Sequence, residues 1–166
     1  NDQLQTKGIE VGHIFYFGDK YSKPMNCSVD GKDGKKIFVK MGSYGIGVSR
    51  LVAAIIEAKF SNDKMKWPKA IAPFDVVIIP AIKKNDNSDI EKSRKIYSLL
   101  KEKGIDVLLD DVEESISNKF KKHDLLGIPY QIIVGSKSTK DQFEFKEVGK
   151  NPQVLEINKI INILKK

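Results

Sequence analysis

Apolar positions in the first half of the chain alternate with polar ones and then take a helical spacing. Residues 8–18 read Gly-Ile-Glu-Val-Gly-His-Ile-Phe-Tyr-Phe-Gly, and this alternation between glycines is typical of a half-buried strand. A polar connection follows with a turn at residues 30–34, and residues 37–44 form the next predicted strand. Residues 47–59 predict a mostly buried helix, because most of their positions are small or apolar.

The second half of the chain has a strand–helix–strand order. Its first segment is a continuous apolar run at residues 74–80, which is typical of a parallel strand buried on both faces. The later segments predict, in order, a helix at 89–103, a strand at 105–109, a helix from Ser115 or Ser117 to Gly127, a strand at 129–135, an antiparallel or edge strand at 142–148 and a helix at 152–164. Together they predict an α/β fold, in which helices cover the faces of a mixed sheet.

The pattern changes between the two halves. The segment 61–72 is polar and contains Pro68, and Pro73 follows it directly. Proline cannot continue a helix and restricts the residue before it, so regular structure is interrupted here. We therefore predict two domains, residues 1–70 and residues 71–166.

The charge of the chain is positive and uneven. The net charge of the 166 residues is +7; residues 1–70 hold 12 basic and 7 acidic residues, and residues 71–166 hold 17 and 15. A basic protein favours a polyanionic partner such as nucleic acid. The alternative is a solvated surface rich in lysine, without such a partner.

Other features of the composition indicate the cellular compartment of the protein. No apolar run approaches the roughly 20 residues that span a bilayer, and no secretory signal pattern opens the chain. The single cysteine, Cys27, excludes an internal disulfide and fits a reducing cytosol, most simply as an inert filler. We expect a cytoplasmic protein without a membrane partner. The first residue is Asn1 rather than methionine, which fits a fragment of a longer protein.

The main candidate for ligand binding is the segment 41–50, Met-Gly-Ser-Tyr-Gly-Ile-Gly-Val-Ser-Arg. Its glycines let a flat ligand approach the backbone closely, and the start of the following helix presents free N–H groups. Arg50 adds a forked cation that suits phosphate. The segment therefore predicts a site for a nucleotide or another planar anionic ligand. Glu10 and His13 lie close together in the preceding strand and are further candidates. The alternative to a functional role is that Glu10 is a surface carboxylate and His13 a core histidine.

A second candidate lies after the predicted strand 105–109, at the edge where α/β sheets bind ligands. Carboxylates at this edge could accept hydrogen bonds from nucleobases, and lysines could meet phosphates. The alternative is a solvated loop and helix face with ordinary ion pairs. The charged residues are Asp110, Asp111, Glu113, Glu114, Lys119, Lys121 and Lys122.

Seven short segments occur in an order and spacing that is highly specific when taken together. They are residues 8–15, Lys20-Tyr21-Ser22, residues 41–50, Trp67-Pro68, Ile71-Ala72-Pro73-Phe74, Leu109-Asp110-Asp111 and Asp124-Leu125-Leu126-Gly127-Ile128-Pro129. With these segments the chain resembles bacterial-type prolyl-tRNA synthetases over nearly its whole length, and residues 41–50 resemble motif 3 of class II aminoacyl-tRNA synthetases. The resemblance implies the end of a class II antiparallel-sheet catalytic domain in residues 1–70, followed by a mixed-sheet α/β anticodon-binding domain in residues 71–166.

The resemblance also implies a reaction: ATP and proline form prolyl-adenylate, and the prolyl group passes to the 3′ end of its tRNA. Arg50 would be the catalytic residue, which stabilises charge on the departing pyrophosphate. ATP would be bound by Glu10, His13, Gly45, Gly47 and Arg50. Proline would be bound by Phe15, Gly42 and Ser43. The anticodon would be bound by Asp110, Asp111, Glu114, Lys119 and Lys122.

The implied cofactors are ATP and Mg²⁺, where the Glu10 carboxylate could help to hold the ion, although no metal ligand is certain. The implied partners are the tRNA for proline, L-proline and a second copy in a homodimer of the full enzyme. Two positions depart from the family. Ser43 stands where members often carry cysteine, and Val112 stands where they often carry arginine. The second departure leaves the individual anticodon contacts open.

Motifs 1 and 2 of class II synthetases have no counterpart in the chain. The resemblance implies that they supply the dimer interface and the arginine that grips the α-phosphate. We therefore predict a ligase fragment that does not activate proline by itself.

Two other functions remain in competition. One is a stand-alone or accessory tRNA-binding module without catalysis, which the intact Gly45, Gly47 and Arg50 disfavour. The other is a small nucleotide-binding α/β protein, which is disfavoured because the first strand–helix turn, residues 80–85, contains no glycine.

Overall fold

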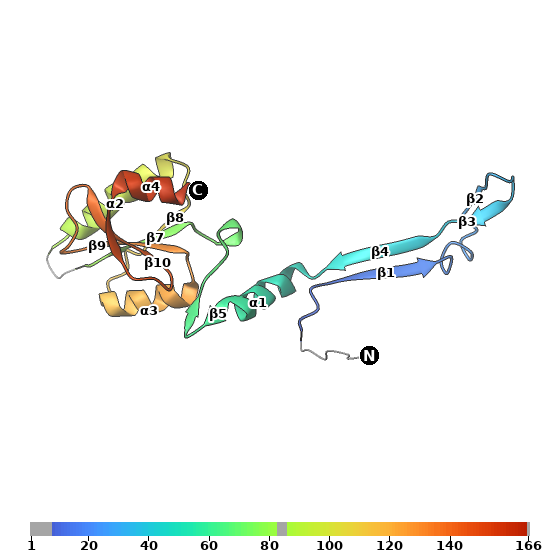
Figure 1. Cartoon of the computed structure of the whole chain (residues 1–166), viewed down its shortest axis with the longest axis horizontal. Helices are drawn as coiled ribbons and strands as arrows, with labels where there is room; N and C mark the ends of the chain where they lie inside the picture. Colours follow the sequence, from blue (N-terminus) through green and yellow to red (C-terminus); the bar gives the residue numbers. More distant parts are fainter. Residues whose placement is uncertain (1–7, 83–85, 166) are drawn as a thin grey trace. The chain divides into compact units, whose positions relative to one another are not determined.

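The computed structural model describes residues 8–82 and 86–165 (Figure 1). The chain divides into two compact units, residues 1–55 and residues 56–166. The division falls inside helix α1 (Val48–Lys59), whereas the boundary predicted between residues 70 and 71 lies inside the second unit.

The first unit consists of two antiparallel strand pairs and the start of α1. β1 (Gly12–Gly18) pairs with β4 (Met41–Ile46), and β2 (Ser28–Asp30) pairs with β3 (Lys36–Phe38). The prediction of one strand at residues 37–44 was therefore wrong. This segment contributes to two strands with different partners, and the pairing of distant segments decides where each strand ends.

The second unit contains a mixed five-stranded sheet in the order β11-β10-β9-β7-β8. β7 is parallel to β8 and β9, whereas β10 is antiparallel to β9 and β11. The strands are β7 (Val76–Pro80), β8 (Val107–Leu109), β9 (Tyr130–Val134), β10 (Gln142–Glu147) and β11 (Gln153–Glu156). The helices are α2 (Ser88–Glu102), α3 (Ile116–Leu126) and α4 (Ile157–Leu164). The mixed α/β sheet predicted from the sequence is thus confirmed.

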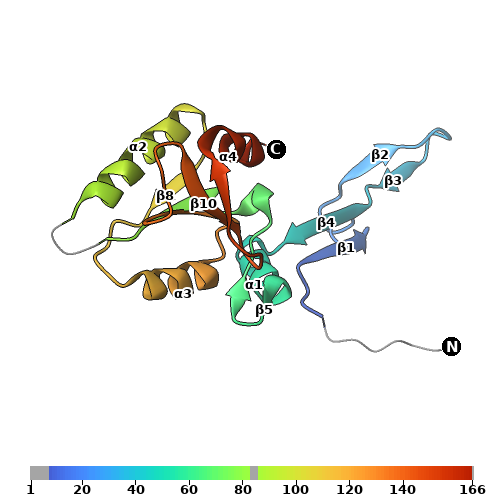
Figure 2. The same ribbon diagram turned by 60° about the vertical axis from the view of Figure 1, so that its left-hand side comes forward.

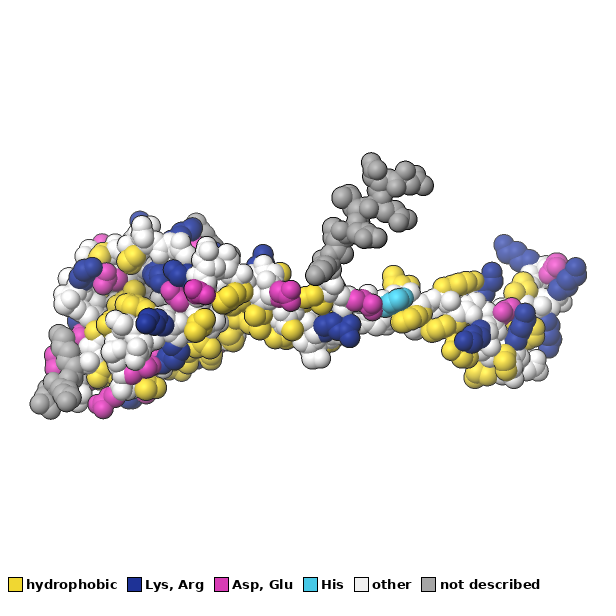
Figure 3. All heavy atoms as spheres, turned by 90° about the horizontal axis from the view of Figure 1, so that it is seen from below, with side chains coloured by type: hydrophobic (Ala, Val, Ile, Leu, Met, Phe, Trp, Pro, Cys, Tyr) yellow, Lys and Arg dark blue, Asp and Glu magenta, His cyan; other side chains and the backbone are white. Residues whose placement is uncertain are grey.

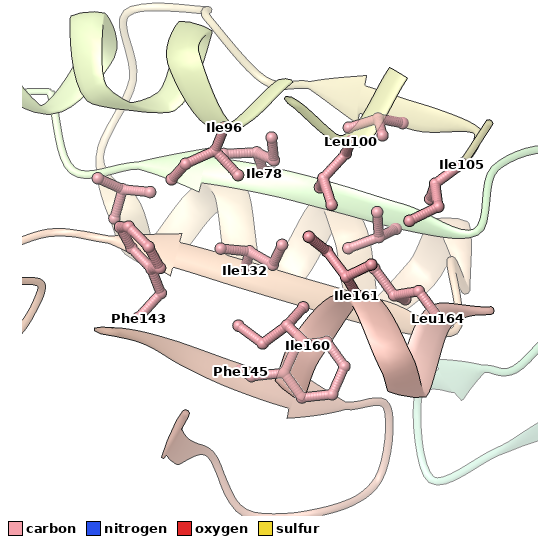
Figure 4. Close-up of a cluster of buried hydrophobic side chains, with 13 residues drawn as sticks. Ile78, Ile96, Leu100, Ile105, Ile132, Phe143, Phe145, Ile160, Ile161 and Leu164 are labelled. Carbon is pink, nitrogen blue, oxygen red and sulfur yellow. The ribbon is translucent and has the colours of Figure 1, made fainter. Parts of the chain in front are cut away.

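Helices cover both faces of this sheet, with α2 and α4 on one face and α3 on the other (Figures 1 and 2). The alternation along β7 explains the two layers, because Val76 and Ile78 point to the α2/α4 side and Val77 and Ile79 to the α3 side. The larger core lies under α2 and α4 and is drawn in Figure 4. Its side chains include Ile96, Leu100, Ile132, Phe143, Phe145, Ile160 and Leu164.

The ends of α3 follow the sequence signals. Ser115 caps the N-terminus, where its hydroxyl accepts a hydrogen bond from the backbone N–H of Asn118. Gly127 ends the helix with a φ of 71°, which is unfavourable for residues with a Cβ. The helix predicted at 152–164 is correct only from Ile157 onward, because residues 153–156 pair with β10 as the edge strand β11.

The segment 61–72, predicted to be a polar boundary, contains local structure of the second unit. β5 (Phe60–Ser61) and β6 (Lys64–Met65) form a tight hairpin, and a short 3₁₀ turn (η1) covers Lys69–Ile71. Positive φ angles at Asn62 and Asp63 fit such a two-residue turn. Among the helices in the described ranges, none is both long and apolar enough to cross a bilayer.

Candidate functional site

Strand pairing in the first unit brings several of the residues predicted to bind ATP and proline together. In the β1–β4 register His13 lies opposite Gly45, and Phe15 lies opposite Ser43. Directly opposite residues share a face of a strand pair, so these four positions lie on one face. Gly42 lies opposite Tyr16 and therefore belongs to the other face.

The shared face carries a stack of aromatic rings. The rings of His13 and Phe15 are 4.1 Å apart at an interplanar angle of 8°, and those of Phe15 and Phe17 are 5.9 Å apart at 6°. Phe15 remains 45% exposed, so the stack leaves an apolar surface open to a ligand. Next to the stack, the carboxylate of Glu10 lies 3.5 Å from Nδ1 of His13.

Arg50 is held close to the start of β1. Its Nη1 donates a hydrogen bond to the backbone oxygen of Glu10 at 2.9 Å, across 40 residues of sequence. The backbone N–H of Gly47 also bonds to the oxygen of Val11 at 3.0 Å, which fixes the first turn of α1. The guanidinium and the Glu10 carboxylate therefore lie at the same end of the strand pair.

Gly42 and Gly45 differ in how closely the surrounding chain approaches them. A Cβ at Gly42 would lie 3.0 Å from the backbone oxygen of Phe15, so the strand pair itself restricts that position. A Cβ at Gly45 would meet no atom of the described chain within 4 Å. The strand pair therefore gives no steric reason for glycine at position 45, and the surface there is free for a ligand.

The charged residues predicted to bind an anticodon fall into a buried group and a partly or fully exposed group. Asp110, which follows β8, and Lys119, on α3, have side chains that are 3% and 0% exposed. Nζ of Lys119 donates to the backbone oxygens of Asp110 at 2.8 Å and of Pro80 at 3.4 Å. Lys119 thus links the ends of β7 and β8, and a direct phosphate contact would need its ammonium to leave this site.

The Asp110 carboxylate is the centre of this network. Its Oδ2 lies 2.7 Å from Nε2 of His123 and 2.9 Å from Nζ of Lys122, which also contacts Glu114. Burial alone raises the pKa of Asp110, but hydrogen bonds from Lys122 and His123 and the charge of Lys119 outweigh it and hold the pKa below its usual value.

Burial has the larger effect on the two buried bases. It lowers the pKa of His123 and the pKa of Lys119, although the Asp110 charge opposes both shifts. Hydrogen bonds to Glu114 and Asp110 instead raise the pKa of Lys122. At pH 7 His123 is therefore neutral, and its Nε2–H donates to the ionised carboxylate. Its Nδ1 is buried and has no hydrogen-bond partner among the described residues.

The partly or fully exposed group lies around this network. The side chain of Asp111 is 57% exposed, with Arg94 at 3.9 Å, and those of Lys122 and Glu114 are 37% and 27% exposed. A pocket of about 380 Å³ opens beside α3, with apolar side chains and three charged ones in its lining. It is lined by Ile116, Phe120, Ile133, Lys137, Glu144, Lys146 and Pro152.

Comparison with known proteins gives the family. Residues 75–166, more than half of the chain, match the family model described as the anticodon binding domain. The chain belongs to the anticodon binding domain family. In this domain the Asp110 network and the pocket both lie at the α3 face of the sheet.

The relatives extend the match beyond the anticodon binding domain. The chain is 56% identical over 165 residues to the proline–tRNA ligase of Pelagibacter ubique, covering 98% of the chain and 37% of the relative. It is 51% identical over 160 residues to that of a Wolbachia species from Brugia malayi, covering 95% and 37%. The chain thus spans little more than a third of the length of these relatives.

A solved structure agrees with these matches. Prolyl-tRNA synthetase of Giardia lamblia in complex with prolyl-adenylate matches with a TM-score of 0.71 at 27% identity, covering 91% of this chain and 32% of that one. The resemblance to prolyl-tRNA synthetases inferred from the sequence is therefore confirmed.

The sequence interpretation missed three features of the second unit. It did not identify His123 as a partner of Asp110, the pocket residues Phe120 and Lys146, or the docking of Trp67. The indole N–H of Trp67 donates to the backbone oxygen of Leu126 at 3.0 Å. The helical spacing of Ile116, Lys119 and His123 was an available signal, because positions i, i+3 and i+7 share one helix face.

Proposed function

We propose that the anticodon binding domain of this chain recognises the anticodon of the tRNA for proline. We propose further that the preceding residues form one wall of the site where a proline–tRNA ligase makes prolyl-adenylate. The high identity to proline–tRNA ligases supports both parts. In this proposal the partners are tRNA, L-proline and a second copy of the full enzyme, and the reaction takes place in the cytoplasm.

The buried network around Asp110 is the observation that carries the anticodon assignment. It fixes the loop between β8 and α3, so that Asp111, Glu114 and Lys122 stand on a rigid support. Rigid carboxylates can accept hydrogen bonds from nucleobase amino groups, and a lysine can pair with a phosphate. In this proposal Asp110 and Lys119 belong to the anticodon site as positioning residues.

The pocket beside α3 supplies a complementary surface for a base. Phe120 and Ile116 give it an apolar lining, and an unstacked base gains from contact with an aromatic ring. Nζ of Lys146 lies 5.8 Å from the ring centroid of Phe120 and pairs with Asp124 at 3.1 Å. In this proposal the Lys146 ammonium lies near the phosphate of the nucleotide whose base occupies the pocket.

The aromatic stack and Arg50 support the catalytic assignment. In the proposed reaction a carboxylate oxygen of proline attacks the α-phosphorus of ATP, and the bond to the pyrophosphate oxygen breaks. Arg50 stabilises the negative charge on the departing pyrophosphate, which is an electrostatic contribution. Gly45 leaves room for adenosine along β4, and Phe15 with Ser43 lines the proline side, with Gly42 on the adjoining backbone.

The fit to Mg²⁺ is limited to Glu10. The described residues contain no group of three or more His, Cys, Asp or Glu side chains that could form a metal cage. Mg²⁺ in nucleotide sites commonly uses one or two carboxylates together with substrate phosphates and water. The single exposed carboxylate of Glu10 fits that mode, and the ion would supply further positive charge for the phosphates.

Binding of tRNA to the 166-residue chain tests the anticodon assignment. We expect the tRNA for proline to bind more tightly than the same tRNA with a substituted anticodon, and Asp111→Asn with Lys122→Gln to reduce the difference. Lys159→Gln, on α4, is the control and should preserve it. Equal affinity of the wild-type chain for both tRNAs would refute the assignment.

The competing proposal is a tRNA-binding module without catalysis. A chimera distinguishes the two proposed functions. In it, this chain replaces the matching 165 residues of the Pelagibacter ubique ligase. We expect proline-dependent ATP–pyrophosphate exchange by the chimera and none by the chain alone. A folded chimera that binds tRNA but lacks exchange would favour the module.

A further inference from the structure

The first unit carries a concentrated positive charge in the segment that connects β1 to β4. We name residues 19–40 the basic hairpin, because β2 and β3 lie within them. This segment holds six lysines and three aspartates, and so contributes +3 to the net charge of +7. All six lysines, namely Lys20, Lys23, Lys32, Lys35, Lys36 and Lys40, are exposed.

Internal ion pairs leave part of this charge free. Lys23 pairs with Asp19 at 2.9 Å, and Lys35 lies 3.9 Å from Asp33. Within the described ranges Lys32, Lys36 and Lys40 have no ion pair, although Lys36 lies across from Asp30 in the β2–β3 register. Figure 3 shows the resulting group of dark-blue side chains at the end of the first unit that carries β2 and β3.

The basic hairpin is ordered by backbone hydrogen bonds rather than by a core. The N–H of Cys27 bonds to the oxygen of Ser22 at 2.9 Å, the N–H of Val39 to the oxygen of Cys27 at 3.2 Å, and the N–H of Gly31 to the oxygen of Lys35 at 2.7 Å. Ser22 is the sole fully buried residue in this stretch. The lysines therefore present exposed charges from a hydrogen-bonded backbone, and Lys20 also lies over the ring of Tyr21, at 5.5 Å from its centroid.

The position of the basic hairpin along the strand pair gives it a reason to meet RNA. It starts directly after β1 and ends directly before β4, the two strands that carry Phe15 and Ser43. A strand advances about 3.3 Å per residue, so Met41, where β4 begins, lies about 7 Å along the strand from Ser43. In the proposed ligase the 3′ end of tRNA must reach this place to accept the prolyl group.

We propose that the basic hairpin binds the phosphodiester backbone of the tRNA acceptor arm. This inference rests on the proposed function. Lysines act as point charges toward phosphates and carry no sequence information, so the contact positions the 3′ end and adds affinity without choosing the tRNA. Release of counterions from RNA is the driving force, and binding must weaken with added salt.

Neutralising the lysines of the basic hairpin, compared with neutralising lysines elsewhere, tests the contact. The variant Lys32→Gln/Lys36→Gln/Lys40→Gln removes the three unpaired lysines. Its control, Lys95→Gln/Lys103→Gln/Lys159→Gln, removes the same charge from exposed positions that have no ion pair within the described part of the second unit. Both are made in the chain and in the chimera. The probes are an acceptor-arm minihelix without an anticodon and an isolated anticodon stem-loop.

We expect the hairpin variant to bind the minihelix at least about tenfold more weakly than the wild type. Because each phosphate contact contributes about 0.9 to the slope of log affinity against log salt, its slope should fall by about 2 to 3. Its binding of the anticodon stem-loop, and pyrophosphate exchange by the chimera, should equal those of the wild type. The control variant should match the wild type with the minihelix.

Equal minihelix binding by the hairpin variant and the wild type, or equal losses in the hairpin and control variants, would overturn the inference. The proposed function would survive either result if the wild-type chain still prefers the proline anticodon. Loss of that preference in the wild type would instead refute the function itself.

Discussion

Nζ of Lys119 lies 2.8 Å from the backbone oxygen of Asp110, and both side chains are almost completely buried. A buried ammonium is tolerated only where hydrogen bonds and an opposite charge compensate for lost hydration, and this one also binds the oxygen of Pro80. The pair therefore ties the ends of β7 and β8 to α3.

Replacement of Lys119 by methionine should destabilise the second unit. The side-chain volume is similar, but two backbone oxygens lose their donor and Asp110 loses a counter-charge. We expect a loss of about 3 kcal/mol in the free energy of unfolding. Urea unfolding followed by the fluorescence of Trp67, the single tryptophan, measures it. The control Lys121→Met changes an exposed lysine and should stay within about 0.5 kcal/mol. Equal midpoints for the two variants would contradict the structural role.

Stability of the second unit should fall as the pH drops below about 6.5. The folded-state pKa of His123 lies below its unfolded value of about 6.5, so the unfolded state binds more protons below that pH. Asp110, whose pKa is also lowered, adds stability that is complete above its unfolded pKa of about 3.9 and is lost as the pH falls through its folded pKa. Both groups therefore favour unfolding in acid.

Urea midpoints between pH 7.5 and 5 isolate the histidine. We expect His123→Gln to remove most of the decrease between pH 6.5 and 5, and His13→Gln, in the first unit, to preserve it. If His123→Gln keeps the wild-type pH dependence in that range, the assignment of the neutral buried imidazole is wrong.

A side chain at position 127 should cost more stability than a side chain at position 104, although both glycines have the same backbone conformation. A Cβ at Gly127 would lie 2.8 Å from the backbone of Met65, whereas a Cβ at Gly104 would meet nothing within 4 Å. Their φ angles are 71° and 74°. We expect Gly104→Ala to cost about 1 kcal/mol and Gly127→Ala at least about 2 kcal/mol, by the same urea assay. Similar costs would show that residues 64–67 do not pack on the end of α3.

Alanine at position 45 should separate folding from ligand binding. Its Cβ meets no described atom, so the unfolding of the chimera should change by less than about 0.5 kcal/mol. In the proposed site the added Cβ would keep adenosine from approaching the backbone closely. The KM for ATP in pyrophosphate exchange should therefore rise at least about tenfold. Gly8→Ala, where a Cβ also meets nothing, is the control. An unchanged KM for ATP in Gly45→Ala would remove this residue from the site.

The sequence was sufficient for the elements whose signals are local. Ser115 and Gly127 predicted the ends of α3, and the apolar run at 74–80 predicted the central parallel strand. The strand β11 was missed because its pairing with β10 is a tertiary interaction, and the segment after Pro152 has no local signal that excludes a helix.

The candidate sites were predictable to a similar extent. Strand alternation with the family motifs identified the residues that the β1–β4 register brings together. For Lys119 the sequence indicated an exposed charge, because polar residues after a parallel strand commonly face a ligand. Its burial depends on Asp110 and Pro80, which lie 9 and 39 residues away, and residue type alone does not reveal such a network.

Charging of tRNA by the chimera tests the central claim most directly, because it requires both the catalytic wall and the anticodon surface. The measurement is kcat/KM for attachment of proline to the tRNA for proline and to the same tRNA with a substituted anticodon. We predict charging of the first tRNA within about tenfold of the parent ligase and at least about a hundredfold preference over the second, equivalent to roughly 2.7 kcal/mol. A folded chimera that charges neither tRNA, or both equally, would contradict the account.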